Sequence, residues 1–329
     1  MDLTQFLYTE ASSITDLLNK REGESKLGER VRYGEDYASD TTQFVVLGIA
    51  ESIGVKGNLG IAGAHTAWQV FLKSFLNIQN TKALKAESIH LLGHFNFQVL
   101  YDSCNTTEDY RKATEFVDDA VYPIIKEIVS HGKIPIIIGG SHANAYPIIK
   151  GCSLAHKTGI AAINLDAHAD FRQLEGRHSG NPFSYSHHEG LLEAYGVIGL
   201  HENYNSQAML DEMDSKQIHY TTWEDIYLRK KVRFEQVIES YVAQFAGYPC
   251  GIELDLDAIS QVLSSAMSSG GFSVTEARQY AYKAAKHPKA AYLHLCEASA
   301  KLENGLESQT TGKLLSYLAT DFIKSYQEA

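Results

Sequence analysis

The chain has 329 residues, of which 44% are hydrophobic and 21% charged, so it is long enough to form one large core or two smaller ones. Its formal net charge is −11 and it has no block rich in lysine and arginine, which argues against a nucleic-acid partner. No apolar run approaches the ~20 residues that span a bilayer, so we expect no membrane segment.

Cysteine usage and the N-terminus favour a cytoplasmic protein. The four cysteines form no C-x-x-C pair and lie in apolar or mixed segments, as is typical of reduced thiols (Cys104, Cys152, Cys250 and Cys296). The first ten residues lack a basic stretch followed by an apolar one and do not resemble a signal peptide. The sequence leaves the oligomeric state open, a homo-oligomer included.

Apolar runs and helical periodicity alternate along the chain. Strands are predicted at residues 44–49, 88–92, 134–138, 160–165, 195–200, 217–220, 250–256 and 291–296. Helices are predicted near residues 6–18 and over 64–76, 106–129, 143–150, 223–243, 273–287 and 311–326. With no repeat and no evident linker, we predict one α/β domain over residues 1–329, built on a mainly parallel sheet of about eight strands.

A glycine-rich loop at residues 51–64 follows the first predicted strand. It lacks both the Lys-Ser/Thr ending and the G-x-G-x-x-G spacing of phosphate-binding loops. We therefore interpret it as the rim of a pocket and keep a phosphate cradle as the weaker alternative.

The most informative stretch is G-I-A-A-I-N-L-D-A-H-A-D, residues 159–170. Side chains spaced by two residues point the same way in an extended chain, so Asp166, His168 and Asp170 would project together from the end of a buried strand. Buried charges are costly unless they are paired or bind a cation, and we therefore predict a metal site here.

Three other predicted strands end in polar residues as well. His142 follows the strand at 134–138, Asp255 and Asp257 end the strand at 250–256, and Glu297 ends the last strand. Sites in parallel α/β sheets lie at the carboxyl ends of the strands, where these side chains would meet.

Two divalent cations would balance the four aspartates, and two neutral imidazoles would complete their ligands (Asp166, Asp170, Asp255, Asp257, His142 and His168). Oxygen and imidazole ligands without thiolate favour Mn²⁺, although Zn²⁺, Ni²⁺ or Co²⁺ would also bind. Paired cations lower the pKa of water and so provide a nucleophile without serine or cysteine. Each motif alone also fits a structural role, such as acids that cap a helix, and it is their joint placement that favours metal.

The same motifs give the chain a resemblance to the ureohydrolase family, which includes arginase, agmatinase and formimidoylglutamase. The family pattern stands here as G-G-S-H (139–142), D-A-H-A-D (166–170), E-L-D-L-D (253–257) and C-E-A-S (296–299). The resemblance covers residues 44–322 and implies a three-layer α/β/α fold with two Mn²⁺ per chain. It implies one Mn²⁺ on His142, Asp166, Asp170 and Asp255, and the other on Asp166, His168, Asp255 and Asp257.

Within the family, N-L-G (58–60), A-D-F-R (169–172) and H-S-G-N-P-F (178–183) are most similar to formimidoylglutamase. That resemblance implies hydrolysis of N-formimidoyl-L-glutamate, a small linear amidine of histidine degradation, to glutamate and formamide. Glu297 would pair with the amidinium group, and His178 would deliver a proton to the departing amine. Arg172 would bind a substrate carboxylate, with Arg177 as a weaker candidate for that role.

Some positions depart from the family pattern, among them Ser141, Ile61 and Ala300. Glu253 adds a further carboxylate, which would either disfavour an anionic substrate or lie one shell behind the metal ligands. Alternatives are therefore a ureohydrolase that releases urea from arginine, agmatine or a guanidino acid, and an arginase-like scaffold that binds without turnover. A two-metal phosphoesterase would need more His and Asn ligands and a cationic phosphate clamp.

Overall fold

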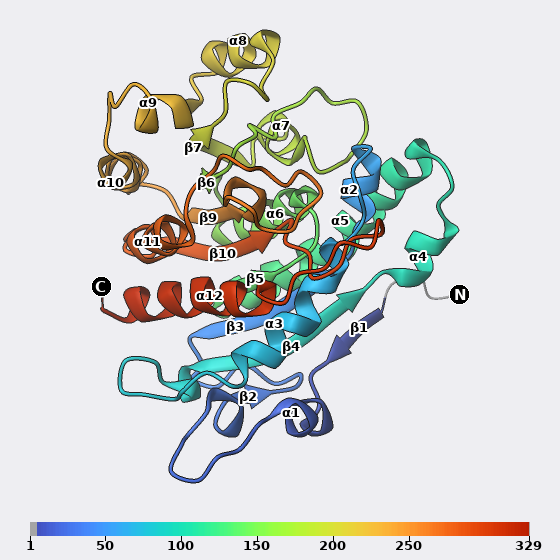
Figure 1. Ribbon diagram of the computed structural model, residues 1–329, viewed down its shortest axis with the longest axis vertical. Coiled ribbons are helices and arrows are strands. Elements are labelled where there is room, and N and C mark those ends of the chain that lie inside the picture. The colour runs from blue at the N-terminus through green and yellow to red at the C-terminus, as the bar shows by residue number, and fades with distance from the viewer. Residues whose placement is uncertain (1–4, 329) are drawn as a thin grey trace.

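The computed structural model describes residues 5–328; residues 1–4 and 329 of the predicted domain lie outside the described residues. Within residues 5–328, one sheet contains ten strands in the order β1-β4-β3-β5-β10-β9-β6-β7-β8, with β2 paired to β4. In Figure 1 it extends from β2 and β1 near the bottom of the view to β7 near the top. The strands are β1 Gln5–Tyr8, β2 Arg32–Tyr33, β3 Phe44–Ala50, β4 Ile89–Asn96, β5 Ile134–Ile138, β6 Ile160–Leu165, β7 Leu192–Leu200, β8 His219–Thr222, β9 Cys250–Asp255 and β10 Ala290–Cys296.

Helices connect the strands, and short 3-10 turns η4 and η5 follow β5 and β9. The α-helices are α1 Ala11–Leu17, α2 Ile53–Gly57, α3 Ala67–Phe75, α4 Gln98–Ser103, α5 Thr107–Ser130, α6 Ala145–His156, α7 Pro182–His188, α8 Gln207–Ser215, α9 Trp223–Tyr227, α10 Phe234–Gln244, α11 Val274–Ala284 and α12 Thr311–Glu328. The 3-10 turns are η1 Leu27–Glu29, η2 Ala64–Thr66, η3 Ala86–Ser88, η4 His142–Asn144 and η5 Leu256–Ala258.

Two hydrophobic clusters lie on opposite faces of the sheet. On β3, Phe44 and Val46 belong to the cluster beneath α3, α11 and α12, whereas Val45 and Leu47 belong to the cluster beneath α5 and α6. This alternation follows from the pleat, which sends successive side chains to opposite faces. Burial on both faces explains the fully apolar strands, and it confirms the predicted three-layer α/β/α arrangement.

The sheet differs from the prediction in size and at its edges. It has ten strands within residues 5–328 rather than about eight, because the short segments β1 and β2 pair with β4. Among the strands of residues 5–328, only β1 runs antiparallel to its neighbour, so the prediction of a mainly parallel sheet is confirmed. The helix predicted over 223–243 is two helices, since the chain turns at Lys230, whose φ of 52° is left-handed and ends a helix.

The four strands that lead into predicted site residues are neighbours, in the order β5-β10-β9-β6. All three pairings between them are parallel, so their carboxyl ends lie along one edge of the sheet. This order brings together residues that are 155 positions apart in the sequence, as in the contact between His142 and Glu297.

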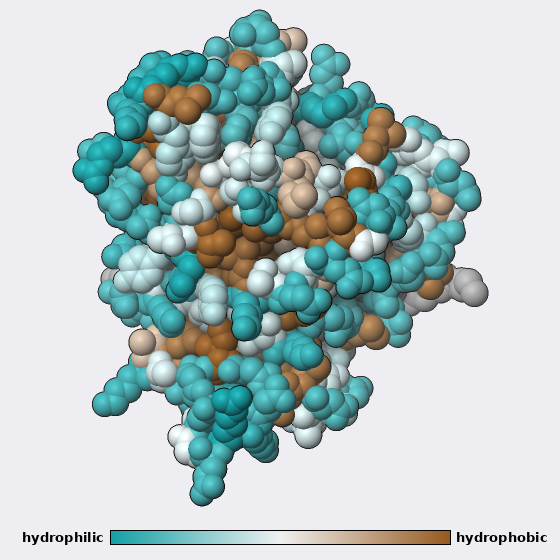
Figure 2. Space-filling view, in the orientation of Figure 1, coloured by the Kyte–Doolittle hydropathy of each residue, from teal (hydrophilic) through white to brown (hydrophobic). Residues whose placement is uncertain are grey.

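The face shown in Figure 2 carries polar side chains over most of its area, and apolar ones gather near its centre. Within the described residues, no helix combines the length and the hydropathy that crossing a membrane requires.

Candidate metal centre and active-site cavity

The imidazole of His142 is the centre of one cluster of carboxylates. Its Nδ1 lies 2.8 Å from Asp170 Oδ2, 3.2 Å from Asp166 Oδ2 and 3.2 Å from Asp255 Oδ2. The ring is buried, and no residue of the described chain forms a hydrogen bond with Nδ1 in acceptable geometry. A nitrogen that faces three carboxylate oxygens without bonding to any of them fits a divalent cation between them.

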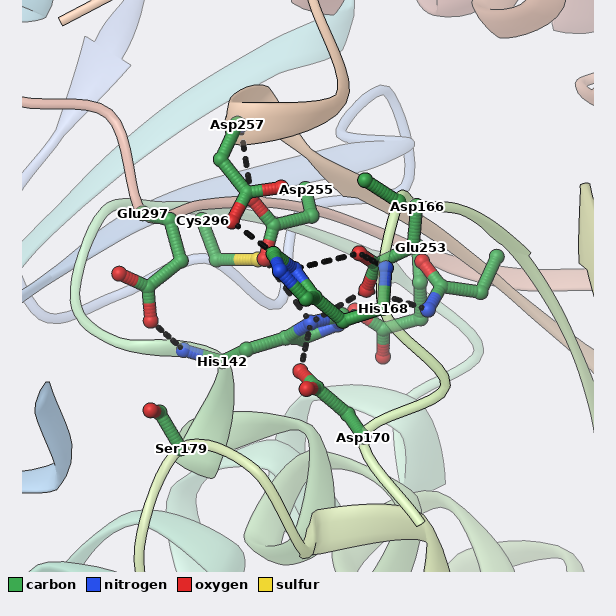
Figure 3. A network of polar contacts seen from close by, with 12 residues as sticks. His142, Asp166, His168, Asp170, Ser179, Glu253, Asp255, Asp257, Cys296 and Glu297 are labelled. Atoms are coloured by element: carbon green, nitrogen blue, oxygen red, sulfur yellow. Dashed lines mark hydrogen bonds and ion pairs between the residues drawn. The ribbon is translucent and has the colours of Figure 1, made fainter. Parts of the chain in front are cut away.

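A second cluster adjoins the first through Asp166 (Figure 3). His168 Nδ1 lies 3.2 Å from Asp257 Oδ2 and 3.6 Å from Asp166 Oδ1. Asp257 Oδ1 is also buried, and within residues 5–328 it has no hydrogen-bond partner. The six predicted ligands therefore form two overlapping groups. Asp255 is grouped with His142, and its predicted role as a bridge to the second cation stays a prediction.

Burial and mutual repulsion make these carboxyl groups hard to ionise together. Burial raises the pKa of Asp170 to about 6, and the charge of Asp166 acts in the same direction. Burial raises the pKa of Asp255 as well, with further contributions from Asp257 and Asp166. Bound cations would reverse this effect, because they favour the charged form of each ligand.

Backbone conformation helps to orient two of the site residues, the ligand Asp170 and the cavity residue Glu297. Asp170 and Glu297 have φ values of 46° and 60°, in the left-handed region that residues other than glycine seldom adopt. Such strain is concentrated at functional sites. The extended chain expected for residues 166–170 is therefore wrong at its end: β6 stops at Leu165, and the left-handed Asp170 turns toward the same ring as Asp166.

The two glycines before Ser141 and His142 are required by the turn itself. Both are left-handed, with φ of 83° at Gly139 and 78° at Gly140. A Cβ on Gly140 would lie 2.3 Å from Asn144 Nδ2, within the space that the neighbouring side chain fills. Gly-Gly-Ser-His is thus a tight turn that delivers His142 from the end of β5.

A buried network lies behind His142. Glu253 Oε2 accepts a hydrogen bond from His294 Nδ1 at 2.7 Å, and Glu253 Oε1 accepts one from Tyr292 at 2.6 Å. The same Oε2 lies 3.6 Å from His142 Nε2. Glu253 is therefore one shell behind the ligands rather than in the cavity. The sequence analysis did not identify Tyr292 and His294, because their partnership with Glu253 depends on the register between β10 and β9.

The two clusters open into a cavity of about 620 Å³. Its lining includes His168, the ligands Asp170, Asp255 and Asp257, and the predicted substrate residues Glu297 and Arg172. Glu297 is buried, and its Oε1 accepts a hydrogen bond from the backbone N–H of His142 at 2.8 Å. Burial raises the pKa of Glu297 to about 8; the His142 N–H lowers it, and the charges of Asp257 and Asp170 raise it further.

Two arginines follow Asp170, and the structure separates their roles. Arg172 is half-exposed in the cavity wall and contacts Glu175 Oε1 through Nη2 at 2.8 Å. Arg177 is buried, donates to Asp118 Oδ2 at 2.9 Å and stacks on Tyr146. Arg177 therefore lies in an internal ion pair and is not available to a substrate.

His178 is buried in the same loop but does not line the cavity. Its Nδ1 accepts the backbone N–H of Gly180 at 3.1 Å, which leaves the proton of the neutral ring on Nε2. That nitrogen lies 3.1 Å from Glu175 Oε1 and donates to it. Both ring nitrogens are therefore engaged, and the predicted proton transfer stays a prediction.

A family model described as the Arginase family matches residues 43–323. This chain belongs to the arginase family. The relatives include the formimidoylglutamase of Streptococcus pyogenes serotype M3, which is 26% identical over 195 residues, 56% of this chain and 56% of that protein. The chain thus spans about half the length of the curated relatives it matches.

Solved structures agree on the fold of the family. The formimidoylglutamase of Bacillus subtilis superposes with a TM-score of 0.76 at 18% identity, covering 95% of each chain. A Trypanosoma cruzi formiminoglutamase structure with Mn²⁺ superposes with a TM-score of 0.71 at 18% identity, covering 92% of this chain and 98% of that one. At these identities the likeness establishes the arginase-like fold.

Proposed function

We propose that this protein is a binuclear-manganese hydrolase that converts N-formimidoyl-L-glutamate and water to glutamate and formamide. The observation that carries the proposal is one cavity that is lined by members of both carboxylate-imidazole clusters and by Arg172. The names of the relatives and the Mn²⁺ in the Trypanosoma cruzi structure support it.

The proposed ligands of the first Mn²⁺ are His142, Asp166, Asp170 and Asp255; those of the second are Asp166, His168, Asp255 and Asp257. Bound manganese would supply Lewis-acid activation of water beside the amidine carbon. Glu253 Oε2 lies 3.6 Å from His142 Nε2, on the side of the ring away from the proposed cation, which is the side where outer-shell partners of metal-ligating histidines lie.

Glu297 is the residue that we propose pairs with the positive end of the substrate. It lines the cavity beside the clusters, and the N–H of His142 holds one of its oxygens. An amidinium presents two N–H donors that match the two oxygens of a carboxylate, so the ion pair would also orient the amidine carbon. The positive charge of the amidinium would favour the charged form of Glu297, whose pKa is raised when no substrate is bound.

Arg172 is the residue that we propose binds a carboxylate of the substrate. The cavity is otherwise acidic, and a ligand with two carboxylates needs a fixed cation within it. The half-exposed guanidinium meets this requirement. His178 would act as a proton shuttle: the neutral ring takes up one proton before it delivers one to the departing amine, which requires a change in its contact with Glu175.

The test is product analysis after reconstitution with Mn²⁺. We expect glutamate and formamide from formimidoylglutamate, with kcat reduced by roughly 10²-fold or more in Glu297→Gln. Urea released from arginine, agmatine or a guanidino acid, without formamide from formimidoylglutamate, would assign another activity of the family. No metal uptake and no turnover would instead favour the scaffold without catalysis.

A further inference from the structure

A single oxygen of Glu175 is surrounded by three cationic or donor groups at the cavity wall. Glu175 Oε1 lies 2.8 Å from Arg172 Nη2 and 3.1 Å from Arg172 Nε. It lies 3.1 Å from His178 Nε2 and 3.7 Å from Arg111 Nη2. Glu175 thus occupies the Nε–Nη2 edge of the Arg172 guanidinium, the group that we propose binds the substrate.

Two of the groups around the Glu175 carboxylate have hydrogen-bond partners other than that carboxylate. The backbone N–H of Gly180 fixes the donor proton of His178 on Nε2. Arg111 reaches across from α5 and donates to the carbonyl oxygens of Gly57 at 3.1 Å and Glu175 at 2.6 Å. The site therefore stays cationic when a carboxylate leaves it, because two guanidinium groups face one carboxylate.

We propose that Glu175 occupies the subsite of the substrate's distal carboxylate, and that an anionic ligand displaces it from Arg172. The inference rests on the proposed function in one respect, the assignment of Arg172 to a carboxylate. Glu175 would keep Arg111 and His178 as partners after displacement, so the exchange leaves no charge unpaired.

This exchange makes Glu175 a specificity-determining residue. A ligand with a carboxylate at the right distance forms an ion pair with Arg172, which replaces the ion pair that Glu175 loses. A ligand whose far end is neutral or cationic regains nothing, and it leaves Arg172 paired. The same contact lowers affinity for every anion, because each must compete with a carboxylate tethered three residues away.

The test is calorimetric titration of the Mn²⁺-loaded protein with glutarate, and with 1,4-diaminobutane as a cation of similar length. We expect Glu175→Gln to bind glutarate about fivefold more tightly than the wild type, since an exposed ion pair no longer competes. Binding of diaminobutane should not tighten. The amide keeps an oxygen that accepts from Arg172 and His178, so the loop should retain its fold.

Two variants complete the design. Glu239→Gln removes an exposed carboxylate of α10 that pairs with Lys283 of α11. It should leave glutarate affinity unchanged, which controls for net charge. In an Arg172→Gln background, Glu175→Gln should lose its effect on glutarate. Equal or weaker glutarate binding by Glu175→Gln, or equal tightening of both ligands, would overturn the inference and make Glu175 a residue that positions Arg172.

The assay of formimidoylglutamate hydrolysis separates this inference from the proposed function. Turnover by the wild type with no gain in glutarate affinity in Glu175→Gln would reject only the inference. Tighter glutarate binding without turnover would reject only the proposed substrate.

Discussion

The loop that buries His178 changes the pKa of its imidazole and therefore its ability to act as a general acid. Burial lowers its pKa to about 4; the hydrogen bond to Glu175 opposes this shift, and the charges of Arg111 and Arg172 add to it. A general acid is most effective when its pKa lies near the working pH. In these surroundings His178 is neutral at pH 7, so proton transfer to a leaving amine requires substrate to change its contacts.

The lowered pKa of His178 predicts a pH dependence of stability. The folded state binds this proton only near pH 4, whereas the unfolded chain binds it near pH 6.5, so the contribution of His178 is complete above pH 6.5 and is lost as pH falls toward 4. Between pH 7 and 4.5, the wild type should lose up to about 2 kcal/mol relative to His178→Asn. Urea denaturation at both pH values measures this difference, and a constant difference would contradict the shift.

At the residue scale, the sequence predicts best what depends on spacing along one strand. Asp166 and His168, like Asp255 and Asp257, are recognisable because acidic residues and histidine directly follow buried apolar strands. The position of Glu253 behind His142 depends on cross-strand register and on neighbours far along the chain, which no local pattern contains. Local patterns likewise do not reveal that Glu175 pairs with Arg172.

At the scale of elements, Glu51 joins the start of α2 to the turn that carries His142. Its Oε2 accepts from the N–H groups of Ile53 at 2.5 Å and Gly54 at 3.1 Å. Its Oε1 accepts from the N–H of Ser141 at 2.5 Å and from Asn144 Nδ2 at 2.7 Å. One buried carboxylate thus satisfies four donors from two elements, a role that the sequence does not reveal.

We expect Glu51→Gln to destabilise the protein by about 1–3 kcal/mol. The amide keeps one acceptor oxygen, but its NH₂ group takes the place of the other oxygen and faces N–H donors. Mn²⁺ affinity should fall as well, since the residue before His142 loses its anchor. Denaturant unfolding and metal titration measure the two effects. Glu303→Gln is the control: its partly exposed pair with Lys56 predicts a loss below about 1 kcal/mol. Normal Mn²⁺ affinity in Glu51→Gln would show that the two elements are not coupled.

Elements are predictable where burial imposes one periodicity. The strands β5 and β6 have the predicted bounds because every residue in them is buried. The edge strands β1 and β2 are short and partly exposed, so no periodicity identifies them as strands. Residues 6–8 of β1 lie in the stretch predicted as helix, and that part of the prediction is wrong because α1 begins only at Ala11. The helices α2, α4, α7 and α8 are nine residues or shorter, and they too went unpredicted.

For the whole molecule, the proposed cations act on charge as well as on chemistry. The net charge of −11 includes a set of buried carboxylates at one edge of the sheet, whose mutual repulsion opposes folding. The alternation of strands and helices brings these carboxylates together. Bound cations are then needed for all of them to be ionised. The fold is therefore expected to be most stable as the metal-bound protein.

Mn²⁺ should consequently raise the melting temperature. A ligand at 100 times its Kd that binds only the native state adds about 2.7 kcal/mol, which corresponds to roughly 4 °C for a chain of this size. Scanning calorimetry with and without Mn²⁺, followed by addition of a chelator, measures the shift and its reversal. Asp257→Asn should gain less, because it removes a ligand whose Oδ1 is buried without a hydrogen-bond partner within residues 5–328. An unchanged melting temperature at saturating Mn²⁺ would be incompatible with the ligand set, since burial of these carboxylates leaves the cation as the main source of compensating charge.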